Sequence, residues 1–343
     1  MMINLKKIKL STEIKQGIWW GIIVGILLLL VISLCVPFIP FAYDVIFGAN
    51  TKDVHAQAVI GNETNSTIIA QKFMIWIRDN TTTPYASRPY LNWIDWSIVN
   101  VNNSPKLFIR TSKASWFIVQ RLGNCIEDAE YFAEMMNHSG YRSRILVVKG
   151  EDHAFAEFYD KDGRKIVVDP SNNLFVNDTL AFGDGKYWSR IEAQDSFGNT
   201  EDVTDKYLRN TSVLTVKTSG NEFLAKRIRI TVESVFLKTR YPGLYNQPLE
   251  VITQAFDQNN TFQVKLGPKK EYQITSSLDL FVINFKSTQA LDLTTNRTIE
   301  LYGEKMVSMN NLEINYVGVF CLILAIAIGY ELGKRLSRQH AQK

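Results

Sequence analysis

Three residues of the types used in nucleophilic acyl transfer occur in the order Cys125, His153 and Asp169. In such chemistry a cysteine thiolate attacks an amide carbonyl, an imidazole shuttles the proton, and a carboxylate orients the imidazole. The other two cysteines, Cys35 and Cys321, lie in apolar segments near the two ends of the chain. Cys125 is therefore the candidate nucleophile, and the three residues predict a Cys-His-Asp triad that acts on amide bonds.

Cys125 is predicted to open a helix. Gly123 breaks the preceding structure, Asn124 is a favourable N-cap, and Glu127 follows three residues later in a capping-box pattern. A thiol in the first turn meets the positive end of the helix dipole, which favours the thiolate and lowers the pKa. A small buried cysteine without chemistry fits the same position. One face of the helix is expected to hold Cys125, Ala129, Phe132, Ala133 and Met136.

His153 is the histidine best placed to act as the base. His138 lies about 20 Å from Cys125 along the same predicted helix. His55 and His340 fall in a predicted linker and a predicted tail. Taken alone, His153 also fits a hydrogen-bonded strand end.

Residues 153–159 and 165–169 predict a β-hairpin whose loop length decides the geometry. A two-residue loop would send Asp169 to the opposite face from His153. A three-residue loop, Lys161–Gly163 with Gly163 left-handed, pairs Phe155 with Asp169. His153 and Asp169 are then same-face diagonal neighbours, about 7–8 Å apart. We predict this loop, with Ala156, Phe158, Ile166 and Val168 on the opposite, apolar face.

The elements around these residues predict a mixed α+β core. Helices are expected over residues 68–79 and 113–120, with irregular chain over residues 81–105. After about Leu214 short strands alternate with turns, which predicts an all-β, sandwich-like domain without His or Cys. The strands expected there are Arg227–Glu233, Leu249–Ala255, Thr261–Leu266, Tyr272–Thr275 and Leu280–Phe285.

Two apolar segments bracket this region. Residues 17–42 carry no charge and would span about 39 Å as a helix, more than the roughly 30 Å hydrocarbon core. This apolar run is about twice that of a cleaved signal peptide, which favours an uncleaved anchor over that alternative. Residues 314–330 form a second, shorter uncharged segment. Basic residues flank both segments, so both termini are expected in the cytoplasm and residues 44–313 outside the cell membrane.

Composition and sequons agree with an exported domain. The chain has 343 residues, 46% of them hydrophobic, and a net charge of +4 that is concentrated at the two ends. A nucleic-acid binder needs positive charge on a folded face, so nucleic acid is not an expected partner. The two apolar segments make the bilayer the expected partner. A single cysteine between the segments excludes a disulfide or a thiolate zinc cluster there, and no metal or cofactor is expected. All nine sequons lie between the segments, at Asn62, Asn65, Asn80, Asn102, Asn137, Asn177, Asn210, Asn259 and Asn296.

The combined motif resembles the transglutaminase-like superfamily. The resemblance is carried by Gly123-Asn124-Cys125, His153-Ala154-Phe155 and Val168-Asp169-Pro170, with the strand entry at residues 140–148 and a helix ending at residues 75–80. It covers roughly residues 68–170 and implies a papain-like α+β core. It also implies Cys125 as nucleophile, His153 as base and Asp169 as the orienting acid. Ile126 stands where the animal enzymes have Trp, so the chain looks closer to compact prokaryotic members, in which hydrolysis is common. The family's oxyanion-stabilising aromatic is not carried over, and Trp93, Trp96 and Trp116 are the candidates.

We therefore expect a membrane-anchored, surface-facing thiol enzyme that cleaves or transfers amide bonds of proteins or cell-wall peptides through a thioester. Water resolves the thioester in a protease or amidase and an amine resolves it in cross-linking, and the sequence leaves both open. The alternative is a catalytically inactive surface scaffold or adhesion protein that uses the same fold for binding. The expected organisation is a tail (1–16), a span (17–43), a linker (44–67), the transglutaminase-like domain (68–210), the sandwich-like domain (211–311), a span (312–331) and a tail (332–343).

Overall fold

The structure is a computed structural model of the chain. It describes residues 12–84, 91–92, 96–176, 182–183, 187–219, 224, 226–268, 271–280, 283–302, 307, 312–314, 322 and 325–326. The chain divides into two compact units, which we describe separately. Unit 1 comprises Met1–Ile145 and Phe155–Phe175, and unit 2 comprises Leu146–Ala154 and Val176–Lys343.

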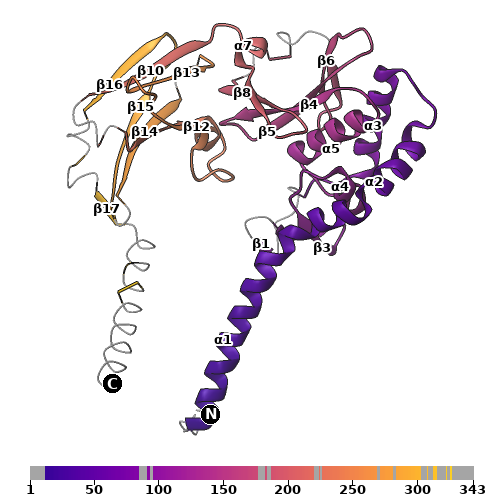
Figure 1. Cartoon of the computed structure of the whole chain (residues 1–343), viewed down its shortest axis with the longest axis horizontal. Coiled ribbons are helices and arrows are strands. Elements are labelled where there is room, and N and C mark those ends of the chain that lie inside the picture. The colour runs from indigo at the N-terminus through magenta and orange to yellow at the C-terminus, as the bar shows by residue number, and fades with distance from the viewer. Residues whose placement is uncertain are drawn as a thin grey trace, which may run out of the picture. The chain divides into compact units, whose positions relative to one another are not determined.

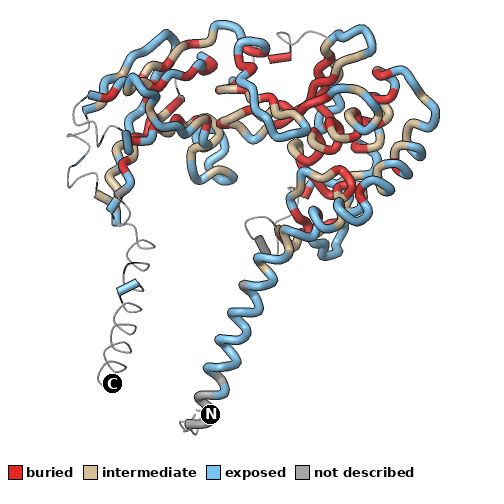
Figure 2. The backbone as a smooth tube through the Cα atoms, viewed as in Figure 1, coloured by how far each residue is buried: buried red, intermediate tan, exposed pale blue. Residues whose placement is uncertain are grey.

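The N-terminal part of unit 1 is a long apolar helix (Figure 1). The side chains of α1 (Thr12–Cys35) are exposed along most of its length, as Figure 2 shows, with Trp19 and Trp20 each 66% exposed. A 3-10 turn, η1 (Val36–Phe38), separates α1 from α2 (Ile39–Ile60), because prolines in this region interrupt the backbone hydrogen bonds. Within the described residues one helical stretch, Trp19–Ile60, is long and apolar enough to cross a membrane.

The structure differs from the prediction at the start of the second predicted span, residues 312–331. Leu312–Ile314 form strand β17, which pairs with β15 (Ile283–Leu291). Nearly all the other residues of this predicted span lie outside the described part of the chain. The described residues thus contain one helix of membrane-spanning character where the sequence predicts two.

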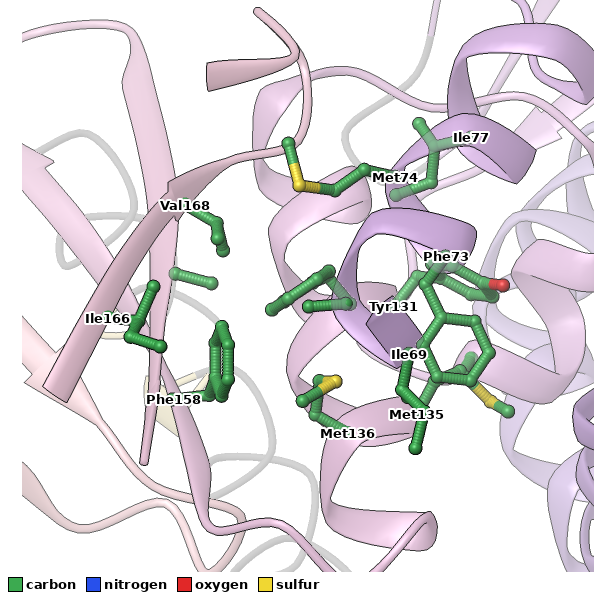
Figure 3. Close-up of a cluster of buried hydrophobic side chains, with 14 of the residues drawn as sticks. Ile69, Phe73, Met74, Ile77, Tyr131, Met135, Met136, Phe158, Ile166 and Val168 are labelled. Carbon is green, nitrogen blue, oxygen red and sulfur yellow. The ribbon is translucent and has the colours of Figure 1, made fainter. Parts of the chain in front are cut away.

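The core of unit 1 lies between helices and a β-hairpin (Figure 3). The helices are α3 (Ser66–Asn80), α4 (Ala114–Gln120) and α5 (Cys125–His138), and the first two agree with the predicted helices. The hairpin consists of β5 (His153–Tyr159) and β6 (Lys165–Asp169). The predicted apolar face of the hairpin is confirmed. On the predicted face of α5 four residues are buried and Cys125 is half-buried. Buried there together are Ile69, Phe73, Met74, Ile77, Phe117, Tyr131, Phe132, Met135, Met136, Ala156, Phe158, Ile166 and Val168.

The segment 44–67, predicted to be a linker, is helical as far as Ile60. Lys52 of α2 pairs with Glu134 of α5 at 2.7 Å. The last turns of α2 also pack apolar side chains, among them Val59, against the core of unit 1. The prediction was wrong because the local pattern is polar. Tertiary contacts, which the local pattern does not reveal, stabilise this helix.

A second hairpin occupies part of the region predicted to be irregular. β2 (Trp96–Val101) and β3 (Ser104–Ile109) pair in antiparallel fashion, and β1 (Leu91–Asn92) pairs with β2. Asn102 and Asn103 connect β2 to β3 with φ angles of 50° and 62°. A two-residue turn with positive φ at both positions matches the twist of paired strands, and Asn tolerates that conformation.

Unit 2 is built mainly from strands. A three-stranded sheet of order β13-β10-β16 and a five-stranded sheet of order β12-β11-β14-β15-β17 share one apolar core. Side chains alternate between buried and more exposed along β10 and β11, as expected for sheets with one buried face. The strands are β10 (Ser212–Ser219), β11 (Ile228–Ser234), β12 (Leu249–Ala255), β13 (Thr261–Leu266), β14 (Tyr272–Leu280) and β16 (Arg297–Tyr302). The predicted strands Leu249–Ala255 and Thr261–Leu266 coincide with β12 and β13, whereas Leu280–Phe285 is divided between β14 and β15.

The units do not divide at the predicted boundary between residues 210 and 211. Within unit 2, Gly267 N donates a hydrogen bond to Ser189 O at 2.7 Å, and Lys265 pairs with Asp205. These bonds join residues on both sides of the predicted boundary. The elements that precede it in unit 2 are β8 (Arg190–Gln194), β9 (Thr200–Asp202) and α7 (Thr204–Tyr207), and α9 (Phe236–Arg240) follows it. The remaining sheet has the order β7-β6-β5-β4-β8-β9, with β4 at Ser143–Lys149 and β7 at Leu174–Val176.

Candidate active site

Cys125 is the first residue of α5, and a capping box holds the start of this helix. The Asn124 side chain accepts a hydrogen bond from Ile126 N at 3.2 Å, and Glu127 accepts one from Asn124 N at 3.0 Å. The predicted capping box is thereby confirmed. Cys125 is half-buried and lies at the positive end of the helix dipole.

Position 123 requires glycine because a side chain does not fit there. A Cβ atom at this position would lie 2.4 Å from Cε2 of Phe117 and 3.0 Å from Cβ of Glu127. Its N–H donates to Thr82 O at 3.3 Å, which ties the chain entering α5 to the segment that follows α3. In so closely packed a place, a larger residue would displace the backbone that leads to Cys125.

Asp169 is the last residue of β6 and is 2% exposed. Its Oδ1 accepts hydrogen bonds from Ser171 Oγ at 2.8 Å and from Asn172 N at 3.2 Å. Its Oδ2 accepts a hydrogen bond from Asn172 Nδ2 at 2.8 Å. These bonds orient the carboxylate. The sequence analysis did not identify Ser171 and Asn172 as donors, and only their position in the turn after Pro170 could have indicated this role.

The hairpin has the predicted three-residue loop. Gly163 N donates to Asp160 O at 3.0 Å and Asp160 N donates to Arg164 O at 3.0 Å, which leaves residues 161–163 as the loop. Gly163 has a φ of 75°, in the predicted left-handed region. The pairs Ala156↔Val168, Glu157↔Val167, Phe158↔Ile166 and Tyr159↔Lys165 have the predicted register. Continued by one pair, this register sets Phe155 opposite Asp169.

Helix α5 runs lengthwise along this hairpin. In its first turn, burial and then the charges of Glu127 and Asp169 raise the pKa of Asp128, so the last residue of β6 lies near this turn. At its last turn, His138 lines a cavity of about 770 Å³ together with Lys161 of the hairpin loop. The helix therefore begins at the open end of the hairpin, where β6 ends, and Cys125 is its first residue.

An unexpected group of acids with raised pKa values lies in the first turns of α5. Burial, followed by the charges of Glu127 and Asp169, raises the pKa of Asp128 to about 7. Burial, with the charges of Glu127 and Glu134, raises the pKa of Glu130 to about 8. Asp128 is 4% exposed, although the sequence placed it away from the buried face, and the acidic run of residues 127–130 was its only signal. Within the part of the chain that the structure describes, no three His, Cys, Asp or Glu side chains are grouped to hold a metal ion.

His153 is the first residue of β5 and belongs to unit 2, whereas Cys125 and Asp169 belong to unit 1. Its ring lies beside that of Trp188, with 5.9 Å between ring centroids and 31° between ring planes. Trp188 was not among the candidate residues, because nothing in its local sequence links it to a histidine 35 positions earlier.

The three tryptophans considered for the oxyanion site differ in their surroundings. Trp116 lies on α4, where Nε1 donates to Gln120 Oε1 at 2.9 Å and the ring lies 5.6 Å from that of Tyr43. Its N–H is therefore already engaged. Trp96 is the first residue of β2, and Trp93 lies outside the described residues. The family's oxyanion aromatic is not identified among them.

Residues 55–170 match the family model of the Transglutaminase-like superfamily. This segment contains Cys125, His153 and Asp169, and it forms a transglutaminase-like domain, so the resemblance inferred from the motifs is confirmed. The match begins within α2, which supports the inclusion of that helix in the domain rather than in a linker. No curated protein matches the chain.

Several solved structures resemble parts of the chain. A candidate protease from Parabacteroides distasonis is 14% identical with a TM-score of 0.28, covering 50% of this chain and 30% of that one. A structure of Rad4–Rad23 crosslinked to an undamaged DNA is 12% identical with a TM-score of 0.34, covering 61% and 52%. A structure of the Rad4/XPC nucleotide excision repair complex is 15% identical with a TM-score of 0.30, covering 42% and 38%. The chain thus spans about half or less of the length of these proteins, and none of them assigns it an activity, substrate or partner.

Proposed function

We propose that this protein is a membrane-anchored thiol enzyme of the transglutaminase-like type, which cleaves or transfers amide bonds of proteins or cell-wall peptides. Cys125 is the proposed nucleophile, His153 the base and Asp169 the orienting acid. The superfamily match over residues 55–170 supports the reaction class. The exposed apolar helix α1, at the start of the helical stretch Trp19–Ile60, supports the membrane anchor.

The observation that carries the proposal is the alignment of α5 with the open end of the hairpin. Cys125 begins α5, and Asp169 ends β6 at the same end of unit 1. The register, continued to Phe155 opposite Asp169, gives His153 the same strand face as Asp169 by alternation along β5. This arrangement supports an imidazole held between the carboxylate and the thiol.

The proposed reaction proceeds in two stages. His153 takes the proton of the Cys125 thiol, the thiolate attacks the amide carbon, and the C–N bond breaks as the leaving amine takes the proton from His153. The Cys125 N–H, at the start of α5, is the proposed donor to the oxyanion. Water then attacks the thioester to give an acid, or a second amine attacks it to give a new amide, and either attack regenerates the thiol.

The state of the Cys125 thiol tests the proposal without a substrate. We would purify the full chain in detergent micelles with Cys35→Ala and Cys321→Ala, so that Cys125 is its one thiol. Iodoacetamide labelling is then followed between pH 5 and pH 9. We expect fast labelling well below pH 7 that is slowed by His153→Ala, because an imidazole-paired thiol is ionised at lower pH than a free thiol. His138→Ala, at the other end of α5, is the matched control and should leave the profile unchanged.

Activity supplies the second test. On peptide amides, with hydroxylamine added to trap acyl transfer, Cys125→Ala should abolish turnover and Asp169→Asn should cost up to about 10⁴-fold in kcat. Turnover like that of the wild type in either variant contradicts the triad. If Cys125 labels as an ordinary thiol, or only after unfolding, the alternative of an inactive surface scaffold or adhesion protein is supported instead. The share of product trapped by the amine distinguishes transfer from hydrolysis.

We also propose that residues 44–313 face outward and that both termini are cytoplasmic, with a second span after Ile314. The basic flanks of the apolar segments and the sequons between them support this orientation. A membrane-impermeant maleimide should label Cys125 in intact cells and should not label a cysteine introduced as Lys343→Cys. Labelling at position 343 in intact cells contradicts the two-span topology.

A further inference from the structure

The turn that immediately precedes His153 is held by residues of the same unit, unit 2, that are distant in the sequence. Residues 150–152 connect β4 to β5, and the Tyr245 hydroxyl donates a hydrogen bond to Asp152 Oδ2 at 2.7 Å. Tyr245 lies between α9 and β12, more than 90 residues from the turn along the chain. Its backbone is itself fixed, because Tyr245 N donates to Tyr241 O at 3.0 Å.

The rest of this turn also contacts other residues of unit 2. Glu151 Oε1 accepts hydrogen bonds from the Ser189 hydroxyl at 3.3 Å and from the Ser234 hydroxyl at 3.5 Å. Gly150 has a φ of 79°, and a Cβ atom there would lie 2.5 Å from Cγ2 of Val251. Gly150 and Glu151 therefore both lie against Ser189 and Ser234, and Asp152 binds Tyr245, so the backbone that enters His153 has little freedom.

Trp188 restricts the imidazole ring itself. Trp188 is 8% exposed, and its ring lies 5.7 Å from that of Phe182 and 5.9 Å from that of His153. Its backbone is fixed as well, because a Cβ atom on Gly267 would lie 2.1 Å from Trp188 O. The neighbouring Ser189 O accepts the hydrogen bond from Gly267 N at 2.7 Å. Trp188 is thus held on one side by an aromatic ring and on another by the backbone near β13.

We propose that Trp188 and Tyr245 are positioning residues for the His153 imidazole. Together with the turn at residues 150–152 they form what we call the His153 collar. The strand-rich unit 2, to which His153 itself belongs, then takes part in the reaction by fixing the orientation of this base. This inference rests on the proposed function of His153 as the base.

The physical reason is that proton transfer requires a base held in a narrow range of positions. A histidine at the first residue of a strand has only one neighbour within the ladder, and strand ends are more mobile than strand centres. Tyr245 restrains the backbone before the ring, and Trp188 restrains the ring. Losing either restraint leaves His153 present while reducing the fraction of time it spends in the productive orientation.

The test follows the NMR signal of His153 itself and does not depend on the reactivity of Cys125. The full chain is labelled with ¹³C-histidine in detergent micelles, and the His153 signal is assigned with His153→Gln. Trp188→Leu removes the aromatic ring, Trp188→Phe retains one, and Tyr245→Phe removes only the hydroxyl. The matched control is Tyr302→Phe in β16, which removes a hydroxyl–carboxylate hydrogen bond of 3.3 Å to Glu300.

We expect the His153 signal to move and broaden in Trp188→Leu and Tyr245→Phe, to be largely restored in Trp188→Phe, and to be unchanged in Tyr302→Phe. In the active enzyme Tyr245→Phe should lower kcat about two- to tenfold with KM unchanged, as for the loss of one hydrogen bond. An unchanged His153 signal in both collar variants overturns the inference, and so does a loss of activity without any change in that signal. If the signal changes while Cys125 labels as an ordinary thiol, the collar is upheld and the proposed enzymatic function fails.

Discussion

Replacing Asp128 by Asn removes a buried negative charge without changing the size of the side chain. Asp128 lies in the first turn of α5, 4% exposed, and its Oδ1 has no hydrogen-bond partner within the described residues. The charges that act on it are those of Glu127 on the same helix and Asp169 on β6, both negative. The lysines that approach from α2 and from the start of α4 bind other acids, since Lys52 pairs with Glu134 and Lys113 with Asp44.

The pKa difference sets the sign and the size of the effect. Asp128 has a pKa of about 7 in the folded protein, against 3.8 for an ordinary aspartate. Between these values the folded chain binds the proton and the unfolded chain does not, so the free energy of unfolding falls as pH rises from about 4 to about 7. Asparagine does not titrate, so the free energy of unfolding of the Asp128→Asn variant does not include this decrease. The stability of Asp128→Asn relative to the wild type should therefore increase by about 3 kcal/mol between pH 5 and pH 8, and stay level above that.

Urea unfolding of the full chain in nonionic detergent, followed by tryptophan fluorescence, measures this difference at pH 5, 6, 7 and 8. Asp162→Asn is the matched control, because Asp162 lies in the hairpin loop of the same unit with its side chain 75% exposed. Its difference from the wild type should stay within about 0.5 kcal/mol at every pH. A difference for Asp128→Asn that is flat with pH, or that shrinks as pH rises, refutes the reasoning that burial and like charge hold this carboxyl protonated.

Three further changes test other parts of unit 1. Gly123→Ala should destabilise the protein by about 1–3 kcal/mol in urea unfolding, because its Cβ would lie 2.4 Å from the Phe117 ring, and an unchanged stability contradicts this close approach. Burial and the nearby Arg121 charge lower the pKa of His55 to about 4, so wild-type stability should rise with pH between about 4 and 6.5. The thermal unfolding temperature of His55→Gln should lack this rise, and a parallel pH dependence would exclude His55 as its source. Asn172→Ala removes one hydrogen bond from the Asp169 carboxylate and should lower kcat about tenfold with KM unchanged, whereas an effect confined to KM would point to substrate binding.

Local sequence patterns predicted the structure correctly wherever residues close together in the sequence determine it. The capping box at Asn124 and Glu127 needs only a side chain and a backbone group three residues apart. The three-residue hairpin loop follows from Gly163, which adopts the left-handed conformation that closes it. The same reasoning missed the β2–β3 hairpin, which lies mostly within residues 81–105, the segment expected to be irregular.

The sequence by itself determined the chemical types of the proposed triad, the helix that begins at Cys125, the register that directs Asp169, and the superfamily. These features depend on residue identity and on spacings of a few positions, where capping, turn chemistry and alternation act. Only the tertiary structure decided that Asp128 is buried beside Asp169. It also decided that Trp188 and Tyr245 enclose the approach to His153. Such contacts join residues far apart in the chain, and their energies come from packing and desolvation, which no local pattern encodes.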